Sequence, residues 1–467
     1  METETDVSKT RRTALLVLLL CLALTGSARA AGKGSGTETG VRIKVSALVE
    51  SDSDPEFGLA GDRESLYLDL KPWFRSTLAP HWTFYTRGQL FASTSTTRLD
   101  SEEGNIVSDG FVGLRQVWVD YDGLTPYPGE SLRVGLQRLR TDDGLFLDTD
   151  IEALAWRFDT TLLDANLFAA QRFAGWRTDS WHLEDEERGR LDLYGDLAWQ
   201  WRPGHWLGGF LMYQKDRDAL PGTGEVIDAE SRRTRRDFLW FGLRADSDGR
   251  NRAGAAGYWL TLMGLTGSRE DLRTEGTVAT GSTRQDVNAW AADLGVSWAL
   301  PLPLPVRVGA AWAMAGGGGE QGTGRLFAAS GLGSNRSRFA GSRSRIYRFG
   351  DFLRPEFSNL QVSTLFATIQ PDERYEGVIL FEDVRLDDPD GPYSSDLMAG
   401  SVVPGSGNIG QELDICLTRY LDTMQWRSIK GRGYLRLRSS MLLAGAAYGD
   451  DEDSLLYRVT LDFFLDF

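Results

Sequence analysis

The chain has 467 residues, with 51 Lys and Arg against 66 Asp and Glu, and a formal net charge of −15 at pH 7. This acidic balance argues against a polyanionic partner such as nucleic acid, although only the charges that line a pathway act on what passes along it. Beyond the N-terminal region, no apolar run reaches the ~18 residues of a spanning helix, which excludes a helical-bundle membrane protein.

The N-terminus has the three parts of a secretory signal peptide. Basic residues at 9–12 precede an apolar run at 14–24, and an A-x-A cleavage site ends at Ala30. This order of charge, apolar core and small residues is typical of a cleaved secretion signal. We therefore predict that residues 1–30 are a signal peptide and that 31–467 form the mature domain.

Segments of alternating apolar and polar residues recur along the mature chain. In the first, Val41, Ile43 and Val45 alternate with Arg42 and Lys44. Successive side chains of a strand point to opposite faces, so such a segment has one apolar and one polar face. The predicted strands are 41–49, 66–75, 81–93, 111–122, 131–140, 151–159, 163–174, 191–202, 205–215, 237–246, 253–266, 287–300, 305–315, 358–369, 377–386, 411–421, 431–446 and 455–467.

The last segment is the most regular. From Tyr457 to Phe467 it alternates an apolar-aromatic parity with a mostly polar one. About ten residues of this pattern suit a membrane-spanning β-strand, and a soluble sandwich strand is the alternative. The C-terminal Phe resembles the closing strand of bacterial outer-membrane barrels, which favours the membrane interpretation.

The eighteen segments predict an all-β fold, an eighteen-stranded antiparallel transmembrane barrel of the porin type. Short connectors such as 202–205 and 301–305 alternate with long polar ones, and the short turns of such barrels face the periplasm. The segment 342–353 would make the strand number odd, so we place it in the long loop after the thirteenth strand. A barrel of this size leaves an aqueous channel, which predicts a pore.

The sequence offers little enzymatic chemistry. Its three histidines (His81, His182 and His205) are scattered, and the run Gly405-Ser-Gly-Asn-Ile-Gly410 lacks the strand–turn–helix context of a dinucleotide site. The acidic run 184–187 is interpreted as a solvated loop, with divalent-cation contact at the lipopolysaccharide surface as the alternative. We expect no catalytic residue, no cofactor and no metal site.

The informative charges lie on the strands. Lys44 and Lys71 fall on the polar parity of the first two strands, and Arg436 and Arg438 on that of the seventeenth. A basic side chain facing lipid at mid-height costs about 2–4 kcal/mol, so these residues are predicted to face the lumen, with Asp462 of the last strand beside them. The parity is not consistent everywhere, because Arg115 and Arg138 share theirs with apolar residues.

A series of motifs resembles the alginate export porins, the eighteen-stranded outer-membrane channels of alginate-secreting bacteria. The longest is Arg115-Gln-Val-Trp-Val-Asp-Tyr-Asp-Gly-Leu-Thr-Pro-Tyr-Pro-Gly-Glu130. Others follow in order over nearly the whole mature chain, at 131–140, 148–154, 160–163, 170–173, 286–289, 334–337, 344–350, 358–361 and 409–414.

The resemblance implies passive export of newly made alginate through a cationic constriction, and a location in the outer membrane of a Gram-negative cell. In these porins the position of Lys71 is typically arginine and that of Asp150 asparagine. Lys71 keeps the positive charge but lacks the planar guanidinium group of arginine, and Asp150 adds a negative charge. The substrate-path residues implied by motif match are Lys44, Lys71, Arg115, Arg138, Asp148, Asp150, Arg336, Arg345, Arg436, Arg438 and Asp462.

The resemblance also implies partners and one difference in gating. The expected partners are alginate, outer-membrane lipids with lipopolysaccharide, and a periplasmic tetratricopeptide-repeat scaffold lipoprotein. Family members carry a long periplasmic turn that can plug the barrel, whereas the corresponding connector here, 422–430, is short. A general anion-selective or nutrient-uptake porin remains the alternative function, and an outer-membrane enzyme such as a lipase would need a nucleophile–base pair that the scattered histidines do not suggest.

Overall fold

The computed structural model describes residues 36–51, 63–101, 104–183, 185–228, 231–247, 255–318, 323–395, 402–426, 429–451 and 454–467. The predicted signal peptide lies outside these residues. Helical structure in the described part of the chain is confined to η3 (Thr323–Arg325) and η4 (Ala446–Asp451). Neither is long or apolar enough to cross a membrane.

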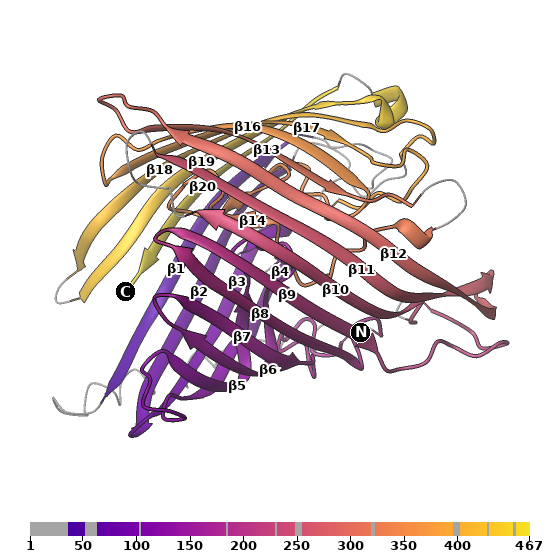
Figure 1. Ribbon diagram of the computed structural model, residues 1–467, viewed down its shortest axis with the longest axis horizontal. Helices are drawn as coiled ribbons and strands as arrows, with labels where there is room; N and C mark the ends of the chain where they lie inside the picture. The colour runs from indigo at the N-terminus through magenta and orange to yellow at the C-terminus, as the bar shows by residue number, and fades with distance from the viewer. Residues whose placement is uncertain are drawn as a thin grey trace.

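The described strands confirm the predicted barrel (Figure 1). Eighteen of them form one antiparallel sheet in which each pairs with the next along the chain, and β1 pairs with both β2 and β20 to close the ring. The barrel strands are β1 (Thr37–Glu50), β2 (Arg63–Ala79), β3 (Trp82–Ser101), β4 (Gly104–Tyr121), β5 (Glu130–Arg140), β6 (Asp148–Asp159), β7 (Leu163–Ala170), β8 (Arg190–Arg202), β9 (His205–Asp216), β10 (Thr234–Ser247), β11 (Ala256–Glu275), β12 (Val278–Ala299), β13 (Val306–Ala315), β16 (Leu360–Ile369), β17 (Tyr375–Arg385), β18 (Asn408–Trp426), β19 (Ile429–Ala444) and β20 (Leu455–Asp466).

The first and last strands close the barrel through their backbones. The N–H of Val41 donates to the carbonyl of Phe467 at 3.1 Å, and the N–H of Phe467 donates to the carbonyl of Val41 at 3.0 Å. Lipid offers no hydrogen bonds to an open sheet edge, so closure is what allows this sheet to span a membrane. The C-terminal strand, whose alternation is the most regular, is therefore paired on both sides, with β19 and with β1.

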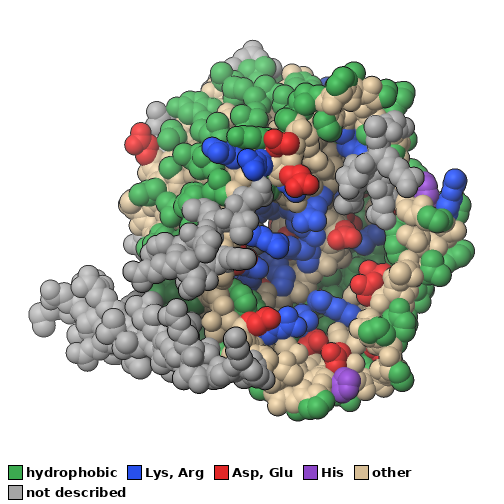
Figure 2. All heavy atoms as spheres, turned by 90° about the vertical axis from the view of Figure 1, so that its left-hand side faces the viewer, with side chains coloured by type: hydrophobic (Ala, Val, Ile, Leu, Met, Phe, Trp, Pro, Cys, Tyr) green, Lys and Arg blue, Asp and Glu red, His purple; other side chains and the backbone are tan. Residues whose placement is uncertain are grey.

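Side chains on the strands alternate between the outer surface and the lumen. On β19, Leu435 and Leu437 are 40% and 39% exposed, whereas Arg436 and Arg438 between and beside them are 6% and 8% exposed. The apolar parity faces outward and the charged parity inward, as the cost of placing a guanidinium in lipid requires. Hydrophobic side chains cover much of the outer rim visible in Figure 2.

The connectors follow the predicted alternation, with one correction. Short turns such as 203–204 lie at the same end of the barrel as the C-terminus, the end that faces the periplasm in outer-membrane barrels. At the other end β11 and β12 are longer than predicted, reaching Glu275 and starting at Val278. The polar residues 267–275 and 278–286 were predicted to be loop. In the structure they continue the antiparallel pairing of β11 with β12.

The predicted loop after the thirteenth barrel strand is confirmed, and it folds into the lumen. Between β13 and β16 the chain forms only β14 (Arg336–Ser337) and β15 (Ile346–Tyr347), which pair with each other and not with the wall. The segment 342–353 is thus not a barrel strand. Several of its side chains, among them Phe352 and Leu353, are fully buried.

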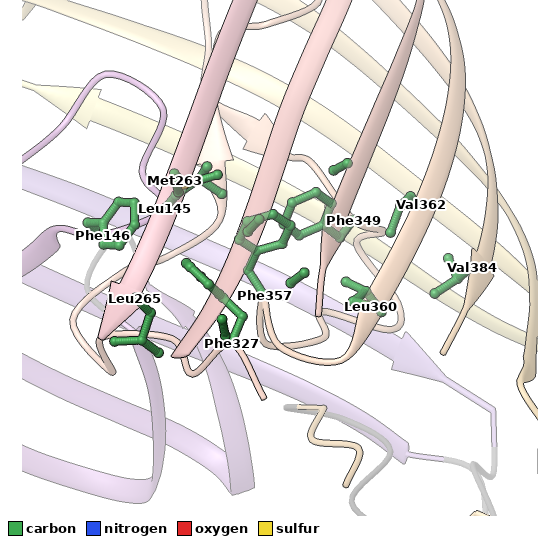
Figure 3. Packing of buried hydrophobic residues seen from close by; sticks show 14 of the residues in the cluster. Leu145, Phe146, Met263, Leu265, Phe327, Phe349, Phe357, Leu360, Val362 and Val384 are labelled. Atoms are coloured by element: carbon green, nitrogen blue, oxygen red, sulfur yellow. The ribbon is translucent and has the colours of Figure 1, made fainter. Parts of the chain in front are cut away.

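An apolar core inside the barrel anchors this loop and fills part of the lumen, so the channel is narrower than the strand number alone predicts. Phe327 and Phe349 of the loop pack against Phe357, and all three belong to the same buried cluster as Phe146 of the β5–β6 connector (Figure 3). The same core includes buried side chains of β8 to β13 and of β16 to β19, such as Trp240 and Leu442. The alternation of apolar and polar residues shows that a strand has two different faces. It does not show that a loop folded into the lumen covers the inner face.

Candidate functional site

The lumen contains a cavity of about 230 Å³ lined mainly by charged groups, here called the basic cavity. It is built from the inner faces of β1, β2, β19 and β20 and from the inward loop. Figure 2, which looks into the barrel from the end bearing the C-terminus, shows Lys and Arg side chains gathered in the hollow. Nine basic residues (Arg42, Lys44, Lys71, Arg140, Arg336, Arg338, Arg343, Arg345 and Arg436) and three acidic ones (Asp69, Asp148 and Asp462) line the cavity.

Four of the five strand residues predicted from parity line this cavity: Lys44, Lys71, Arg436 and Asp462. Lys44 lies 3.3 Å from Asp462, and Lys71 lies 3.2 Å from Asp69, each distance joining Nζ to a carboxylate oxygen. Asp462 also accepts a hydrogen bond from the Ser46 hydroxyl. These pairs hold the lysines in place, and the acidic groups cancel only part of the positive charge of the cavity.

Arg436 and Arg438 play different structural parts although they are two residues apart. The Arg436 guanidinium lines the basic cavity, donates to Thr418 Oγ1 at 3.1 Å and to the Ser344 hydroxyl, and stacks on the Tyr434 ring. Within the described residues no carboxylate forms an ion pair with Arg436, although Asp462, opposite it on β20, acts on its charge at longer range.

Arg438 is instead engaged by carboxylates. Its guanidinium nitrogens lie 3.1 Å from Asp351 and 3.3 Å from Asp462, so it ties the inward loop to β19 and β20. Arg438 does not line the basic cavity. The alternation predicted its direction correctly, but the partner from a loop 87 residues away could not be predicted from strand parity.

A second set of predicted residues meets around two aspartates on β6. Asp150 accepts from Arg115 at 2.9 Å and from Gln116 at 2.8 Å, and Arg87 and Arg138 lie at 3.7 and 3.8 Å. The extra negative charge that distinguishes Asp150 from asparagine is therefore surrounded by three guanidinium groups.

Asp148 binds the next arginines along β5. It accepts from Arg138 Nε at 2.9 Å, from Arg140 and from the Ser334 hydroxyl at 2.6 Å. Since Asp148 and Arg140 also line the basic cavity, this set borders the first. The two aspartates thus fix a row of arginines on the inner wall.

A bulge and a local separation of strands explain why Arg115 and Arg138 break the parity rule. In the β3–β4 ladder Arg87 pairs with Gln116 and Gly88 with Leu114, so Arg115 is the extra residue of a bulge. Pairing between β4 and β5 ends at Val117 and Leu136, and beyond it Gly113 pairs with Arg177 of the β7–β8 loop. Outside the regular ladder, alternation no longer distinguishes lipid from lumen.

The inward loop supplies Arg336 and Arg345. Gly144 of the β5–β6 connector accepts from the backbone N–H groups of Ser334 and Asn335 at 2.9 and 3.0 Å, which places Arg336 against Tyr347. An added Cβ on Gly144 would lie 2.4 Å from the Arg336 carbonyl, so only glycine allows this approach.

Arg345 occupies a position between two cavities. Its guanidinium donates to the carbonyls of Thr141 and Arg336, both at 3.3 Å, and burial together with the nearby Arg140 lowers the pKa of Arg345 to about 10. Arg140, Arg338 and Arg345 line both the basic cavity and a larger one of about 470 Å³. The inward loop therefore separates the two spaces.

Asp143, one of the acids that line the larger cavity, is tightly held. Asp143 lies 2.9 Å from Arg244 and accepts from the Thr141 hydroxyl at 2.7 Å and the Leu145 N–H at 3.1 Å. Burial opposes ionisation of Asp143, but Arg244 and these donors outweigh it and hold its pKa below the ordinary value.

Four arginines of the basic cavity were not among the predicted site residues. Arg42 shares the polar parity of Lys44 and could have been found by extending the same argument. Arg140 ends a strand, and Arg338 and Arg343 belong to the inward loop, where no periodic signal indicates direction.

Comparison with known proteins gives consistent results. Residues 37–462 match a family model described as alginate export. The alginate production protein AlgE of Pseudomonas aeruginosa is 36% identical over 440 residues, covering 89% of each chain. AlgE of Azotobacter vinelandii is 31% identical, covering 90% of this chain and 91% of the relative.

Solved structures show the same fold at low sequence identity. OpdK of Pseudomonas aeruginosa, crystallised with vanillate, has a TM-score of 0.51 at 11% identity, covering 92% of this chain and 99% of OpdK. OccAB2 of Acinetobacter baumannii has a TM-score of 0.51 at 12% identity, covering 92% and 98%. A further structure of OpdK, described as an outer-membrane protein, has a TM-score of 0.50.

Proposed function

This chain belongs to the alginate export family and is an outer-membrane barrel, and we propose that it carries newly made alginate outward past the basic cavity. The observation that supports this path is the positive charge of the basic cavity. Nine basic and three acidic side chains line it, although the chain as a whole is acidic. Family and fold are those of an export channel.

The chemistry of alginate fits such a lining. Each sugar of this polyuronate carries one carboxylate, and guanidinium groups form charge-assisted hydrogen bonds with carboxylates. Transport also requires that no single site hold the chain tightly, because conduction depends on weak and repeated binding. Arginines and lysines spread over four strands and a loop provide several such sites.

We assign distinct roles to the predicted path residues. Lys44, Lys71, Arg336, Arg345 and Arg436 line the cavity and would contact uronate carboxylates. The remaining residues would position these cations or neighbour the path: Arg115, Arg138, Asp148, Asp150, Arg438 and Asp462. On this assignment the aspartates keep the arginines extended and cancel part of their positive charge.

Secretion by an alginate-producing host tests the proposal. A strain lacking its own alginate channel, supplied with this chain, should release uronate to the medium instead of retaining it in the periplasm. The double variant Arg338→Glu/Arg436→Glu should retain uronate in the periplasm while the barrel still assembles. The matched control Arg385→Glu lies on the exposed part of β17 and should export normally.

Two outcomes would argue against export through this cavity. Normal secretion by the assembled double variant would remove the basic cavity from the path. Failure of the wild type to restore secretion, together with conductance of small anions and no block by oligouronates, would favour a general porin.

We also propose three further properties that the resemblance to the alginate export porins implies. These are removal of residues 1–30 on secretion, anion selectivity, and a periplasmic tetratricopeptide-repeat lipoprotein at the short-turn end. Mass spectrometry of the mature N-terminus, reversal potentials in a salt gradient, and co-purification of a tagged barrel with its periplasmic partner test them separately.

A further inference from the structure

Three carboxylates outside the proposed path meet on the lumen wall near the end opposite the C-terminus. They are Glu382 of β17 and Glu412 and Asp414 of β18, and one oxygen from each lies within 4.8 Å of the others. Glu382 and Glu412 are fully buried and Asp414 is 5% exposed. None of them lines the basic cavity.

The hydrogen bonds of this group are incomplete on the side where the carboxylates face each other. Glu412 accepts from the N–H groups of Phe352 and Leu353 at 2.5 and 3.1 Å, and Asp414 Oδ2 accepts from the Asp351 N–H at 2.9 Å. Both oxygens of Glu382 and Oδ1 of Asp414 have no hydrogen-bond partner in the described part of the chain. Buried carboxylate oxygens are rarely left in this state without a bound ion or proton.

Nearby arginines do not supply the missing positive charge. Arg348, the arginine that acts on Glu382, is ion-paired with Asp293. Arg354 and Arg438 are both paired with Asp351. Within the described residues, no Lys or Arg nitrogen forms an ion pair with the three carboxylates, so their charge requires protons or a cation.

We propose that Glu382, Glu412 and Asp414 form a Ca²⁺ site. All three ligands are carboxylates, and hard oxygen ligands select Ca²⁺ or Mg²⁺ over transition metals. Mg²⁺ gives up its water reluctantly and usually keeps several water ligands, whereas Ca²⁺ accepts a shell of protein oxygens. Because Glu382 and Glu412 are fully buried, the group suits Ca²⁺ better than Mg²⁺.

A cation at this site would stabilise the contact between the inward loop and the barrel wall. The loop backbone at 351–353 already donates three N–H groups to Glu412 and Asp414. Gly350, at φ +94°, lies so close that an added Cβ would be 2.2 Å from a Glu412 oxygen. A cation would neutralise the carboxylates on which this loop rests and thereby fix the segment that carries Arg345 and Arg348.

Equilibrium dialysis with ⁴⁵Ca²⁺ on the purified full-length barrel, stripped with a chelator, tests the proposal. The wild type should bind one Ca²⁺ per chain more than Glu382→Gln. The matched control Asp383→Asn removes one charge from the next residue of β17, where Asp383 pairs with the exposed Arg385, and should bind as the wild type does. Sites on the acidic outer loops contribute equally to all three proteins.

Stability provides a second measurement. Chelation should lower the unfolding temperature of the wild type and of Asp383→Asn, and leave that of Glu382→Gln unchanged. Equal Ca²⁺ binding by all three proteins would overturn the proposal and assign protons to the carboxylates.

A measurement on the wild type alone covers the case in which Glu382→Gln does not fold. Crystals soaked in Tb³⁺ should show an anomalous peak about 2.3–2.6 Å from oxygens of all three residues. Peaks confined to the outer loops would reject the site.

Discussion

Arg436 is the residue at which the export path can be tested most sharply, because its charge has no carboxylate partner in the described part of the lumen. Two hydroxyl groups and the Tyr434 ring fix its guanidinium, which uses two of its five N–H donors on Thr418 and Ser344. The residue lines the basic cavity, where its remaining donors would meet a uronate carboxylate. The change to be made is Arg436→Ala.

The expected effect follows from the lost contact. A hydrogen bond to a charged group contributes about 1.5–3 kcal/mol, and the 6% exposure of Arg436 leaves little water to screen it. Since 1.4 kcal/mol corresponds to a factor of ten in affinity, oligouronates should bind at least about tenfold more weakly. The barrel should still assemble, because the substitution leaves neutral hydroxyls and no buried charge unpaired.

The assay is block of ionic current in planar bilayers by uronate oligomers of defined length. The half-blocking concentration should rise at least about tenfold for Arg436→Ala and by less for Arg436→Lys, which keeps the charge but loses the fork. Arg419→Ala, an exposed position on the neighbouring strand β18, is the matched control and should be blocked as the wild type is. An unchanged half-blocking concentration in assembled Arg436→Ala channels would refute the reasoning.

Three further expectations concern the charges around the path. Arg438→Ala leaves Asp351 short of a partner in a buried pair and should lower the free energy of unfolding by about 3 kcal/mol in urea titrations in lipid vesicles, whereas Arg385→Ala at an exposed pair should change it by less than about 1 kcal/mol. Asp150→Asn removes the carboxylate from a group of three arginines and should shift the reversal potential toward stronger anion selectivity; a shift toward cations would show that Asp150 acts only by holding the arginines in place. The pKa of Asp143 is below its unfolded value of 3.8, so its stabilisation is complete above that pH and is lost as the pH falls through the folded value. Asp143→Asn should therefore lose less stability than the wild type between about pH 5 and pH 2, and equal losses would contradict the assigned direction.

The sequence by itself determined the barrel and the direction of its regular side chains. The period of two along a strand is imposed by the backbone, so Lys44, Lys71, Arg436 and Asp462 could be assigned to the lumen without any knowledge of the fold. Eighteen alternating segments were sufficient for the strand number and the antiparallel order of the strands. Motif resemblance was also sufficient for the family.

Only the tertiary structure decided which charges compensate one another. Arg438 meets Asp351 from a distant loop, and Asp150 meets Arg115 through a bulge, and neither contact has a local signal in the sequence. The inward loop likewise fills part of the lumen with an apolar core and separates two cavities lined by charged groups. Such pairings depend on how the closed barrel brings distant segments together, and strand periodicity carries no information about that.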